Sequence, residues 1–279
     1  MNFAQEGESD KPLDWSAWVS AEFAGVEDEQ FGNSSSDFAI LHAGVDWTIQ
    51  PDLILGVMGQ YDWMDETQRE IAAEAGGIRN PTINGAGWMV GPYVVWRPSE
   101  NLILDGLAMA GQSSNDVNPL GWYEDSFDTE RYLFDAGISG IYDFGNWSLR
   151  PNASLAYLQD TQSTYTDSLG FVIPEQDVTL GRLTFGPELS YFIPSSGSTK
   201  WVVGGSLDGV WAFEQTALLT NGGNAYERDE LTANLGVFLG VEIHPGAVLR
   251  FEANSYGLGN EGYSAEALRI ELVKTLGRP

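Results

Sequence analysis

Two kinds of residue in this sequence could carry out chemistry: a pair of histidines and several clusters of acidic side chains. His42 has Asp46 four positions later, and a carboxylate near an imidazole can orient a general base. The second histidine, His244, directly precedes Pro245. Whether either histidine can act depends on the elements around it, because a base must lie within hydrogen-bonding distance of the proton it removes.

The acidic clusters could bind calcium through carboxylate oxygens. They are Glu27-Asp28-Glu29, Asp62 with Asp65-Glu66, and Glu124-Asp125 with Asp128. None has the ligand spacing of an EF-hand or a similar loop, so we expect solvated loop surface and no metal site. The chain has no cysteine, which excludes disulfides, thiolate metal sites and cysteine nucleophiles. No glycine-rich segment lies in a strand-to-helix context that would bind phosphate, so we expect no cofactor.

The elements that position these residues are best defined between Arg131 and Leu158, where two sets of residues alternate. One set is apolar and aromatic, with Tyr132, Phe134, Ala136, Ile138, Gly140, Tyr142 and Phe144. The other is small, polar and charged, with Arg131, Asp135, Gly137, Ser139 and Asp143. A period of two puts the sets on opposite faces of a strand. After the turn at Gly145-Asn146 the alternation resumes, so the segment is a long amphipathic hairpin.

Most of the chain repeats this hairpin. Twelve strands are expected over residues 14–26, 37–49, 53–64, 85–96, 102–113, 127–144, 147–160, 178–193, 200–213, 229–244, 247–256 and 265–275. Tight turns follow the even-numbered segments, and mostly long, acidic loops follow the odd-numbered ones. This asymmetry is typical of outer-membrane barrels. We predict an all-β fold, a 12-stranded antiparallel up-and-down transmembrane β-barrel; residues 69–75 are the only helical suggestion.

A soluble sandwich or a lipocalin-like barrel alternates in the same way, with its apolar face turned inward. Tryptophan placement favours the membrane barrel, because eight tryptophans lie on the apolar face at strand ends. Trp15, Trp47, Trp96, Trp147 and Trp201 adjoin the chain start or the tight turns, and Trp63, Trp88 and Trp211 adjoin the long loops. Only Trp18 and Trp122 fall outside this scheme. Two aromatic rings around an aliphatic band, roughly 25 Å apart on tilted strands, indicate lipid-interface girdles.

The opposite face carries charges of both signs at mid-strand. An arginine on lipid would cost roughly 2–4 kcal/mol, so this face should line a hydrated lumen. The predicted lumen-lining charges are Asp105, Arg131, Asp135, Arg150, Arg182, Glu188, Asp208, Glu242, Arg250 and Glu252. Strands of this length also exceed those of most soluble sheets. Bulky lumenal side chains, namely Trp18, Met58, Met89, Tyr93 and Phe238, predict a narrow pore.

The barrel also bears on the histidines. Membrane-barrel lipases and proteases hold their histidine at the outer rim with serine or aspartate. His42 lies in the middle of its expected strand, and His244 lies at the tight-turn end. We therefore expect both histidines to be structural and the chain to have no catalytic residue and no enzymatic activity.

The amino-acid composition limits the kinds of partner that the chain can bind. A net charge of −27 and a pI near 4.1 argue against nucleic-acid binding, because phosphates would be repelled. No apolar run reaches the 18 or so residues of a membrane helix. The first ten residues have no basic or apolar signal-peptide region, which predicts a mature or trimmed chain. Residues 1–12 are expected to be a short acidic lead-in, and residues 13–279 the barrel.

Four segments carry a resemblance to a known family. They are Gly87-Trp-Met-Val-Gly-Pro-Tyr-Val, Phe127-Asp-Thr-Glu-Arg-Tyr-Leu, Tyr165-Thr-Asp-Ser-Leu-Gly and Leu180-Gly-Arg-Leu-Thr-Phe-Gly-Pro-Glu-Leu-Ser-Tyr. The chain resembles the C-terminal translocator domain of autotransporters, the type Va secretion proteins of Gram-negative bacteria. Translocator domains of that family also have twelve strands. Two departures stand out: twelve residues before Leu13 are too few for a passenger or a pore helix, and the chain does not end on an aromatic residue.

The resemblance implies an outer-membrane barrel that is inserted by the barrel-assembly machinery and takes part in passenger export or surface anchoring. Both termini would then be periplasmic and the long loops extracellular. The alternatives are a stand-alone structural barrel whose acidic loops contact a neighbouring membrane or surface protein, or a narrow channel. The expected partners are outer-membrane lipid, the assembly machinery and a passenger segment.

Overall fold

Long antiparallel strands make up almost all of the computed structural model, which describes residues 15–29, 34–68, 81–119, 121–195, 199–215, 231–260 and 262–276. The barrel strands are β1 (Trp15–Asp28), β2 (Ser34–Gln50), β3 (Leu53–Gln68), β4 (Thr82–Ser99), β5 (Leu102–Asn118), β6 (Asp125–Gly140), β7 (Tyr142–Phe144), β8 (Trp147–Gln162), β11 (Gln176–Ile193), β12 (Trp201–Gln215), β13 (Leu231–His244), β14 (Ala247–Leu258) and β15 (Tyr263–Leu276). The segments β6 and β7 form a single barrel strand, interrupted at Ile141, because both pair with β8.

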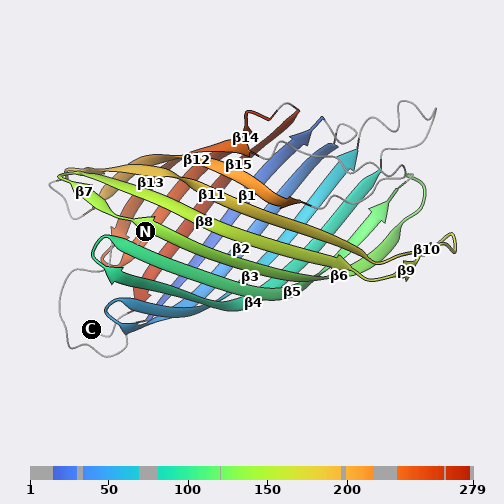
Figure 1. Ribbon diagram of the computed structural model, residues 1–279, viewed down its shortest axis with the longest axis horizontal. Helices are drawn as coiled ribbons and strands as arrows, with labels where there is room; N and C mark the ends of the chain where they lie inside the picture. Colours follow the sequence, from blue (N-terminus) through green and yellow to red (C-terminus); the bar gives the residue numbers. More distant parts are fainter. Residues whose placement is uncertain are drawn as a thin grey trace.

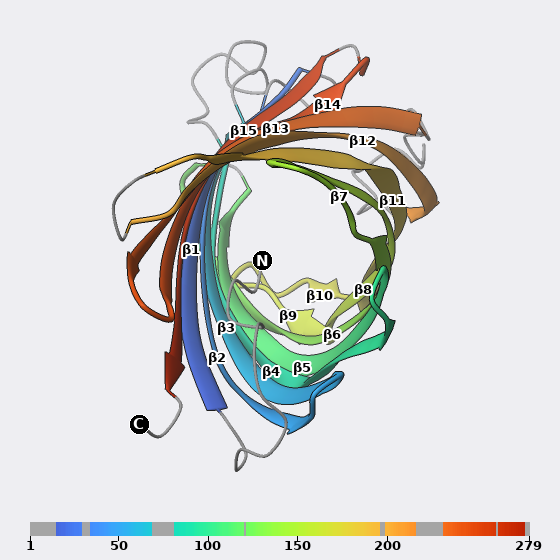
Figure 2. The same ribbon diagram turned by 90° about the vertical axis from the view of Figure 1, so that its left-hand side faces the viewer.

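Each barrel strand pairs with its neighbours in the sequence, and the sheet closes on itself (Figures 1 and 2). The first strand, β1, pairs along its whole length with the last, β15, and β8 pairs with β11. The predicted 12-stranded antiparallel barrel is therefore confirmed. None of the described residues belongs to a helix that is long and apolar enough to cross a bilayer. The expected helix at residues 69–75 and the lead-in at residues 1–12 lie outside the described residues.

Short connections gather at one end of the barrel, which we call the tight-turn end. There the chain turns at Pro51-Asp52, Glu100-Asn101, Gly145-Asn146 and Pro245-Gly246. Gly145 and Gly246 have positive φ angles of 65° and 72°, which side chains other than glycine rarely adopt. The opposite end, which we call the long-loop end, holds a small hairpin of β9 (Tyr165–Thr166) and β10 (Val172–Ile173), visible in Figure 1 beyond the ends of β6 and β8.

The register shows how strongly the strands are staggered. Starting from Ser20 and stepping between directly paired residues in one direction, the row is His42, Gln60, Met89, Gly111, Arg131, Asp160 and Val178. In the other direction it is Glu271, Arg250, Gly240, Val202 and Phe192. Both rows end on β11, at positions 14 residues apart (192 − 178). A closed barrel with this stagger has strands tilted by about 40°, so paired residues climb toward the long-loop end from β1 to β8.

The buried core of this barrel lies on its inner face. Met89, Met109, Val202 and Phe238 are almost fully buried there. Aromatic and aliphatic side chains of the opposite parity, such as Phe134 and Leu155, are exposed on the outside. A soluble protein would bury this apolar face, so the arrangement agrees with an outer surface that is covered by hydrocarbon.

Candidate functional site in the barrel lumen

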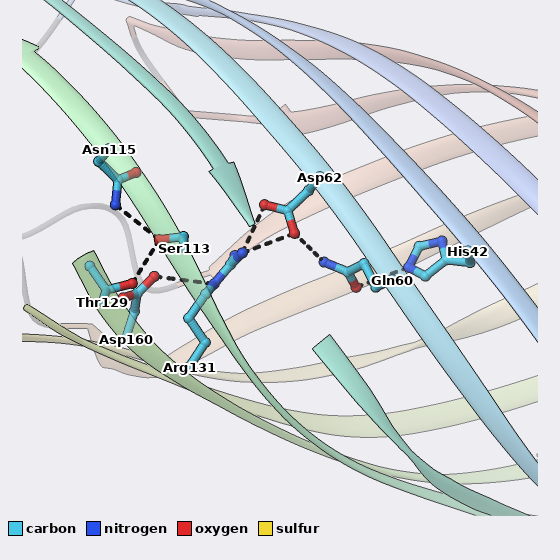
Figure 3. A network of polar contacts seen from close by, with 8 residues as sticks. All are labelled: His42, Gln60, Asp62, Ser113, Asn115, Thr129, Arg131 and Asp160. Carbon is cyan, nitrogen blue, oxygen red and sulfur yellow. Dashed lines mark hydrogen bonds and ion pairs between the residues drawn. The ribbon is translucent and has the colours of Figure 1, made fainter. Parts of the chain in front are cut away.

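An ion-pair network centred on Arg131 lies on the inner wall toward the long-loop end (Figure 3). The Nη1 atom of Arg131 on β6 donates to both carboxylate oxygens of Asp62 on β3, at 2.9 and 2.8 Å. Its Nε atom lies 3.2 Å from Oδ2 of Asp160 on β8, an ion pair without hydrogen-bond geometry. All three side chains are less than one quarter exposed. One cation therefore neutralises two carboxylates and ties together strands that are far apart in the sheet.

Arg131 can reach Asp62 because two glycines lie beneath it. Its direct partner on β5 is Gly111, and the next strand, β4, presents Gly87. A Cβ atom added to Gly87 would lie 2.4 Å from Nη1 of Arg131. A Cβ atom on Gly111 would lie 1.8 Å from the backbone oxygen of Trp88. The wall is thus kept flat where the guanidinium crosses it, and any side chain at Gly87 would push the arginine away.

The network continues from Asp62 to His42 through a glutamine. Gln60 donates from Nε2 to Asp62 at 2.9 Å, and its Oε1 lies 3.0 Å from Nε2 of His42. His42 and Asp46 share a strand face, as expected, but their polar atoms do not meet. Asp46 instead accepts from Tyr93 at 2.7 Å and from Ser16. Among the described residues, the side-chain hydrogen bond of His42 is to Gln60 and not to a serine or threonine hydroxyl.

A second cluster surrounds Asp46 nearer the tight-turn end. The hydroxyl of Tyr93 on β4 donates to Asp46 on β2 and accepts from Nε1 of Trp18 on β1 at 2.9 Å. The tyrosine ring passes over β3 at Gly56, where an added Cβ atom would lie 2.3 Å from the ring. Trp18 in turn covers Gly44, where a Cβ atom would lie 2.6 Å from its indole. Aromatic side chains therefore lie flat on glycines in this part of the lumen.

Further polar contacts surround two arginines, Arg250 on β14 and Arg269 on β15. Arg250 on β14 donates to Glu188 on β11 at 3.2 Å and pairs with Glu252 at 3.1 Å. Its guanidinium carbon lies 3.7 Å from the centre of the Phe238 ring, a cation–π contact. On β15, Arg269 donates to Ser20 at 3.0 Å and to Glu271 at 3.1 Å. The Arg250–Glu188 ion pair links β14 to β11. The Arg269–Ser20 hydrogen bond links β15 to β1, the two strands that close the barrel.

Four of the remaining predicted lumen charges line two lumenal cavities, and Asp208 and Glu242 line neither. A cavity of about 680 Å³ at the tight-turn end is lined by Asp105, Asp135 and Arg150, together with Trp18 and Tyr93. A cavity of about 380 Å³ at the long-loop end is lined by Arg182. Asp208 lies against Gly186, and Glu242 pairs with Lys200 at 3.2 Å. The two cavities share no lining residue, and the Arg131 network lines neither of them.

The eight tryptophans of the expected girdles all lie on the outer face. These residues are 39–48% exposed, which fits an outward direction on a closed barrel. Trp18, which falls outside the scheme, faces the lumen, and Trp122 lies in a loop with 63% exposure. Contact of the eight side chains with lipid interfaces stays a prediction.

Two acidic residues of the Arg131 network, Asp62 and Asp160, are absent from the expected charges, as is the uncharged Gln60 that joins Asp62 to His42. From the sequence, Asp62 is expected among the loop acids with Asp65 and Glu66, but the structure places it on the inner face of β3. The signal that would have found it is parity, because Met58, Gln60 and Asp62 alternate along one strand face. Among the described residues, no three His, Cys, Asp or Glu side chains are grouped so that they could hold a metal ion.

The β9–β10 hairpin is an element that the alternation does not predict. The backbone N–H of Ser168 donates to Asp125 at 2.7 Å, and the rings of Phe127 and Tyr165 stack with their centres 5.7 Å apart. Burial raises the pKa of Tyr165 above its ordinary value, and the carboxylates of Asp125 and Asp167 raise it further. These contacts hold the hairpin against the end of β6.

Comparisons with known proteins agree with the barrel. The family described as autotransporter beta-domain matches residues 17–254. The beta domain of the Bordetella autotransporter BrkA superimposes with a TM-score of 0.75 and 13% identity, covering 94% of this chain and 100% of the other. The transport unit of AIDA-I from Escherichia coli gives 0.71 and 13%, covering 98% and 93%. The translocator domain of NalP from Neisseria meningitidis gives 0.67 and 14%, covering 94% and 88%. No curated protein matches the chain in sequence.

Proposed function

Because the chain belongs to the autotransporter beta-domain family, we propose that it exports, or anchors at the cell surface, a passenger segment joined to its N-terminal side. The chain is a bacterial outer-membrane β-barrel of the type V secretion class. Translocator barrels transport or anchor other segments, and we assign no enzymatic role to this one.

The observation that carries the proposal is where β1 begins. Trp15 pairs with Leu276, so the first and last strands meet at the tight-turn end. The first two inward-facing residues of β1, Ser16 and Trp18, line the 680 Å³ cavity at that end. A polypeptide that continues upstream of Trp15 therefore starts at the mouth of the lumen. The same cavity carries carboxylates and guanidinium groups, which can accept hydrogen bonds from the backbone N–H groups of an extended chain and donate to its C=O groups, whatever its side chains are.

Export of an N-terminal passenger requires one orientation of the barrel in the membrane. The tight-turn end faces the periplasm, and the long-loop end, with the β9–β10 hairpin, faces outward. The tryptophans at the two ends lie at the two lipid interfaces, where indole side chains are enriched. Insertion requires the barrel-assembly machinery of the outer membrane as a partner.

A surface-display experiment tests this function. A signal peptide and an epitope-tagged reporter are fused ahead of Trp15, and the fusion is expressed in a Gram-negative host. We expect added protease to remove the reporter from intact cells, while the same reporter fused after Pro279 stays protected. If the barrel folds, as shown by its heat-modifiable migration on gels, but the N-terminal reporter stays protected, the proposal is wrong.

Two adjacent residues of β8 allow a matched test of whether the passenger passes through the lumen. Ser154 faces the lumen opposite Gly137, and Ala153 has the opposite parity and faces outward. Ser154→Trp should reduce display of the reporter because the lumen becomes narrower, and Ala153→Trp should not. Equal display by the two variants would contradict passage through the lumen.

A further inference from the structure

Three prolines lie inside barrel strands, and each interrupts one backbone ladder. The ladder between β4 and β5 skips Pro92, that between β6–β7 and β8 skips Pro151, and that between β11 and β12 skips Pro187. All three residues are exposed on the outer face. Proline has no N–H group, so these positions cannot donate to the neighbouring strand. In hydrocarbon an unpaired backbone group is costly, so each interruption weakens the wall.

The three prolines lie at similar heights along the barrel axis. Each step along a row of directly paired residues raises the position by roughly 3 Å, and each residue along a strand changes it by about 2.6 Å. From Tyr93 three such steps lead to Ala156 on β8, five residues further from the tight turn than Pro151. Pro151 is therefore roughly 6 Å lower than Pro92, and Pro187, its direct partner on β11, roughly 3 Å lower.

Glycines continue this band across the strands between the prolines. Gly106 on β5 and Gly137 on β6 lie at the same height, and glycine inside a strand often marks a bend. Gly91 and Gly186 directly precede two of the prolines. Cβ atoms added there would lie 1.8 and 2.2 Å from a backbone oxygen of the facing strand. Hydrogen bonds and side chains that hold strands in place are thus reduced at one height.

We call this band the bend line; it consists of Pro92, Gly106, Gly137, Pro151 and Pro187. Between the bend line and the tight turns lies a part of the wall that we call the entry wall. It comprises residues 102–107, 137–140 and 142–144 of β5, β6 and β7. None of the described ion pairs or side-chain hydrogen bonds joins the side chains of the entry wall to another strand.

The walls on either side are tied by side chains. Tyr93 of β4 donates to Asp46 of β2, and Arg250 of β14 donates to Glu188 of β11. Nearer the long-loop end, Arg131 ties β6 to β3 and β8. The entry wall is therefore held above the bend line and at its two flanks, and its lower part depends on the backbone ladder alone.

The entry wall also lines the 680 Å³ cavity at which β1 begins. Ile103, Asp105 and Leu107 contribute to this cavity, together with Ser16 and Trp18 of β1. A movement of the entry wall away from the lumen would enlarge the cavity without disturbing the pairing of β1 with β15. The weakest section of the sheet thus borders the mouth of the lumen.

We propose that the entry wall bends outward at the bend line when a passenger enters, and that this widening admits segments bulkier than an extended chain. The inference rests on the proposed export function. The side-chain ties on both flanks and the Arg131 network keep the rest of the barrel closed, so the widening is confined to the entrance.

Two reporters fused ahead of Trp15 test the widening: an extended one without cysteine, and the same one closed into a loop by a disulfide. The triple variant Pro92→Val, Pro151→Val and Pro187→Val restores the missing N–H groups. We expect it to display the extended reporter as the wild type does, and the looped reporter at least about tenfold less. Pro98→Val with Pro245→Val is the matched control, because these prolines lie at the tight turns, and it should display both reporters.

Hydrogen exchange of the purified barrel measures the same flexibility without a passenger. Amides of the entry wall should exchange at least about tenfold faster than those of residues 15–19 on β1, whose ladders to β2 and β15 are uninterrupted. The triple variant should remove this difference. If that variant does not fold, the comparison within the wild-type barrel decides.

The two measurements separate the bend line from export itself. A wild-type barrel that displays neither reporter contradicts the export proposal, whereas its exchange rates still test the bend line. The inference is overturned if the folded triple variant displays the looped reporter as well as the wild type does. It is also overturned if the entry wall and residues 15–19 of the wild type exchange at equal rates.

Discussion

Tyr93 donates a 2.7 Å hydrogen bond to Asp46 although a complete strand, β3, lies between the strands that carry them. The contact exists because β3 presents Gly56 at the crossing point, with room for a ring and none for a Cβ atom. The lumen of this barrel is thus held together by side chains that skip a neighbour, in addition to the backbone ladder.

Substituting Gly56 by alanine should displace the Tyr93 ring, because the new methyl group would lie 2.3 Å from it. Overpacking and the lost hydrogen bonds to Asp46 and Trp18 together should lower the free energy of unfolding by about 2–3 kcal/mol. Urea unfolding in lipid vesicles measures this change. Gly59→Ala is the control on the same strand; a loss of similar size there would contradict the crossing argument.

Replacing Arg131 by methionine should leave the carboxylates of Asp62 and Asp160 without their cation. We expect a loss of about 2–3 kcal/mol, below the roughly 3–5 kcal/mol of a fully buried pair, because these side chains keep partial contact with water. Lys200→Met breaks a 3.2 Å pair with Glu242 in which the lysine is 69% exposed, and should cost less than about 1 kcal/mol. Equal losses in the two variants, measured by vesicle unfolding, would argue against the network as a cross-link.

An arginine on the outer face should be much less tolerated than one in the lumen. Ile270 on β15 is 44% exposed and points outward at mid-strand, where an arginine should cost about 2–4 kcal/mol in a bilayer. Ser154→Arg places the same charge on the inner face and should cost less than about 1 kcal/mol. Vesicle-unfolding free energies give the comparison, and similar values would mean that the apolar face does not contact lipid.

Alkaline pH should loosen the β9–β10 hairpin. The pKa of Tyr165 is raised where its ring stacks on Phe127, so the docked hairpin keeps its proton at a pH at which the released hairpin has lost it. Docking is therefore unaffected below the released-state pKa near 10, and weakens as the pH rises above it. The chain has no cysteine, so a single spin label at Leu169→Cys reports the mobility of the hairpin at pH 8 and pH 11.

The control for this experiment is Tyr165→Phe, which keeps the ring but cannot ionise. Its hairpin should show a smaller increase in mobility at high pH. An identical increase in both proteins would assign the effect to other groups.

Strand alternation predicts which side chains share a face, because that depends only on neighbouring residues. Tryptophan placement and the charges on the opposite face were needed to predict the barrel and to put Phe134 on its outer face and Arg131 on its inner face. Strand alternation could not predict that Arg131 pairs with Asp62, three strands away. That pairing depends on the 14-residue stagger of the closed sheet and on two glycines that happen to lie along the path.

There is a simple geometric reason why the side chains of His42 and Asp46 do not meet. Residues four apart on a strand lie about 13 Å apart, so they share a face without touching. The partner of His42 is the residue directly across on β3, Gln60, which no spacing within one segment reveals. The β9–β10 hairpin was missed because strands of two residues carry no period; its signal is the turn from Asp167 to Gly170, whose glycine has a φ of 88°.

The pairing of β1 with β15 has a consequence for biogenesis. Until β15 pairs with β1, the sheet is open and has two bare edges. A product that stops before Tyr263 retains both edges, and unpaired strand edges recruit other chains into aggregates. Premature termination is therefore hazardous in this protein even when it removes only the last strand.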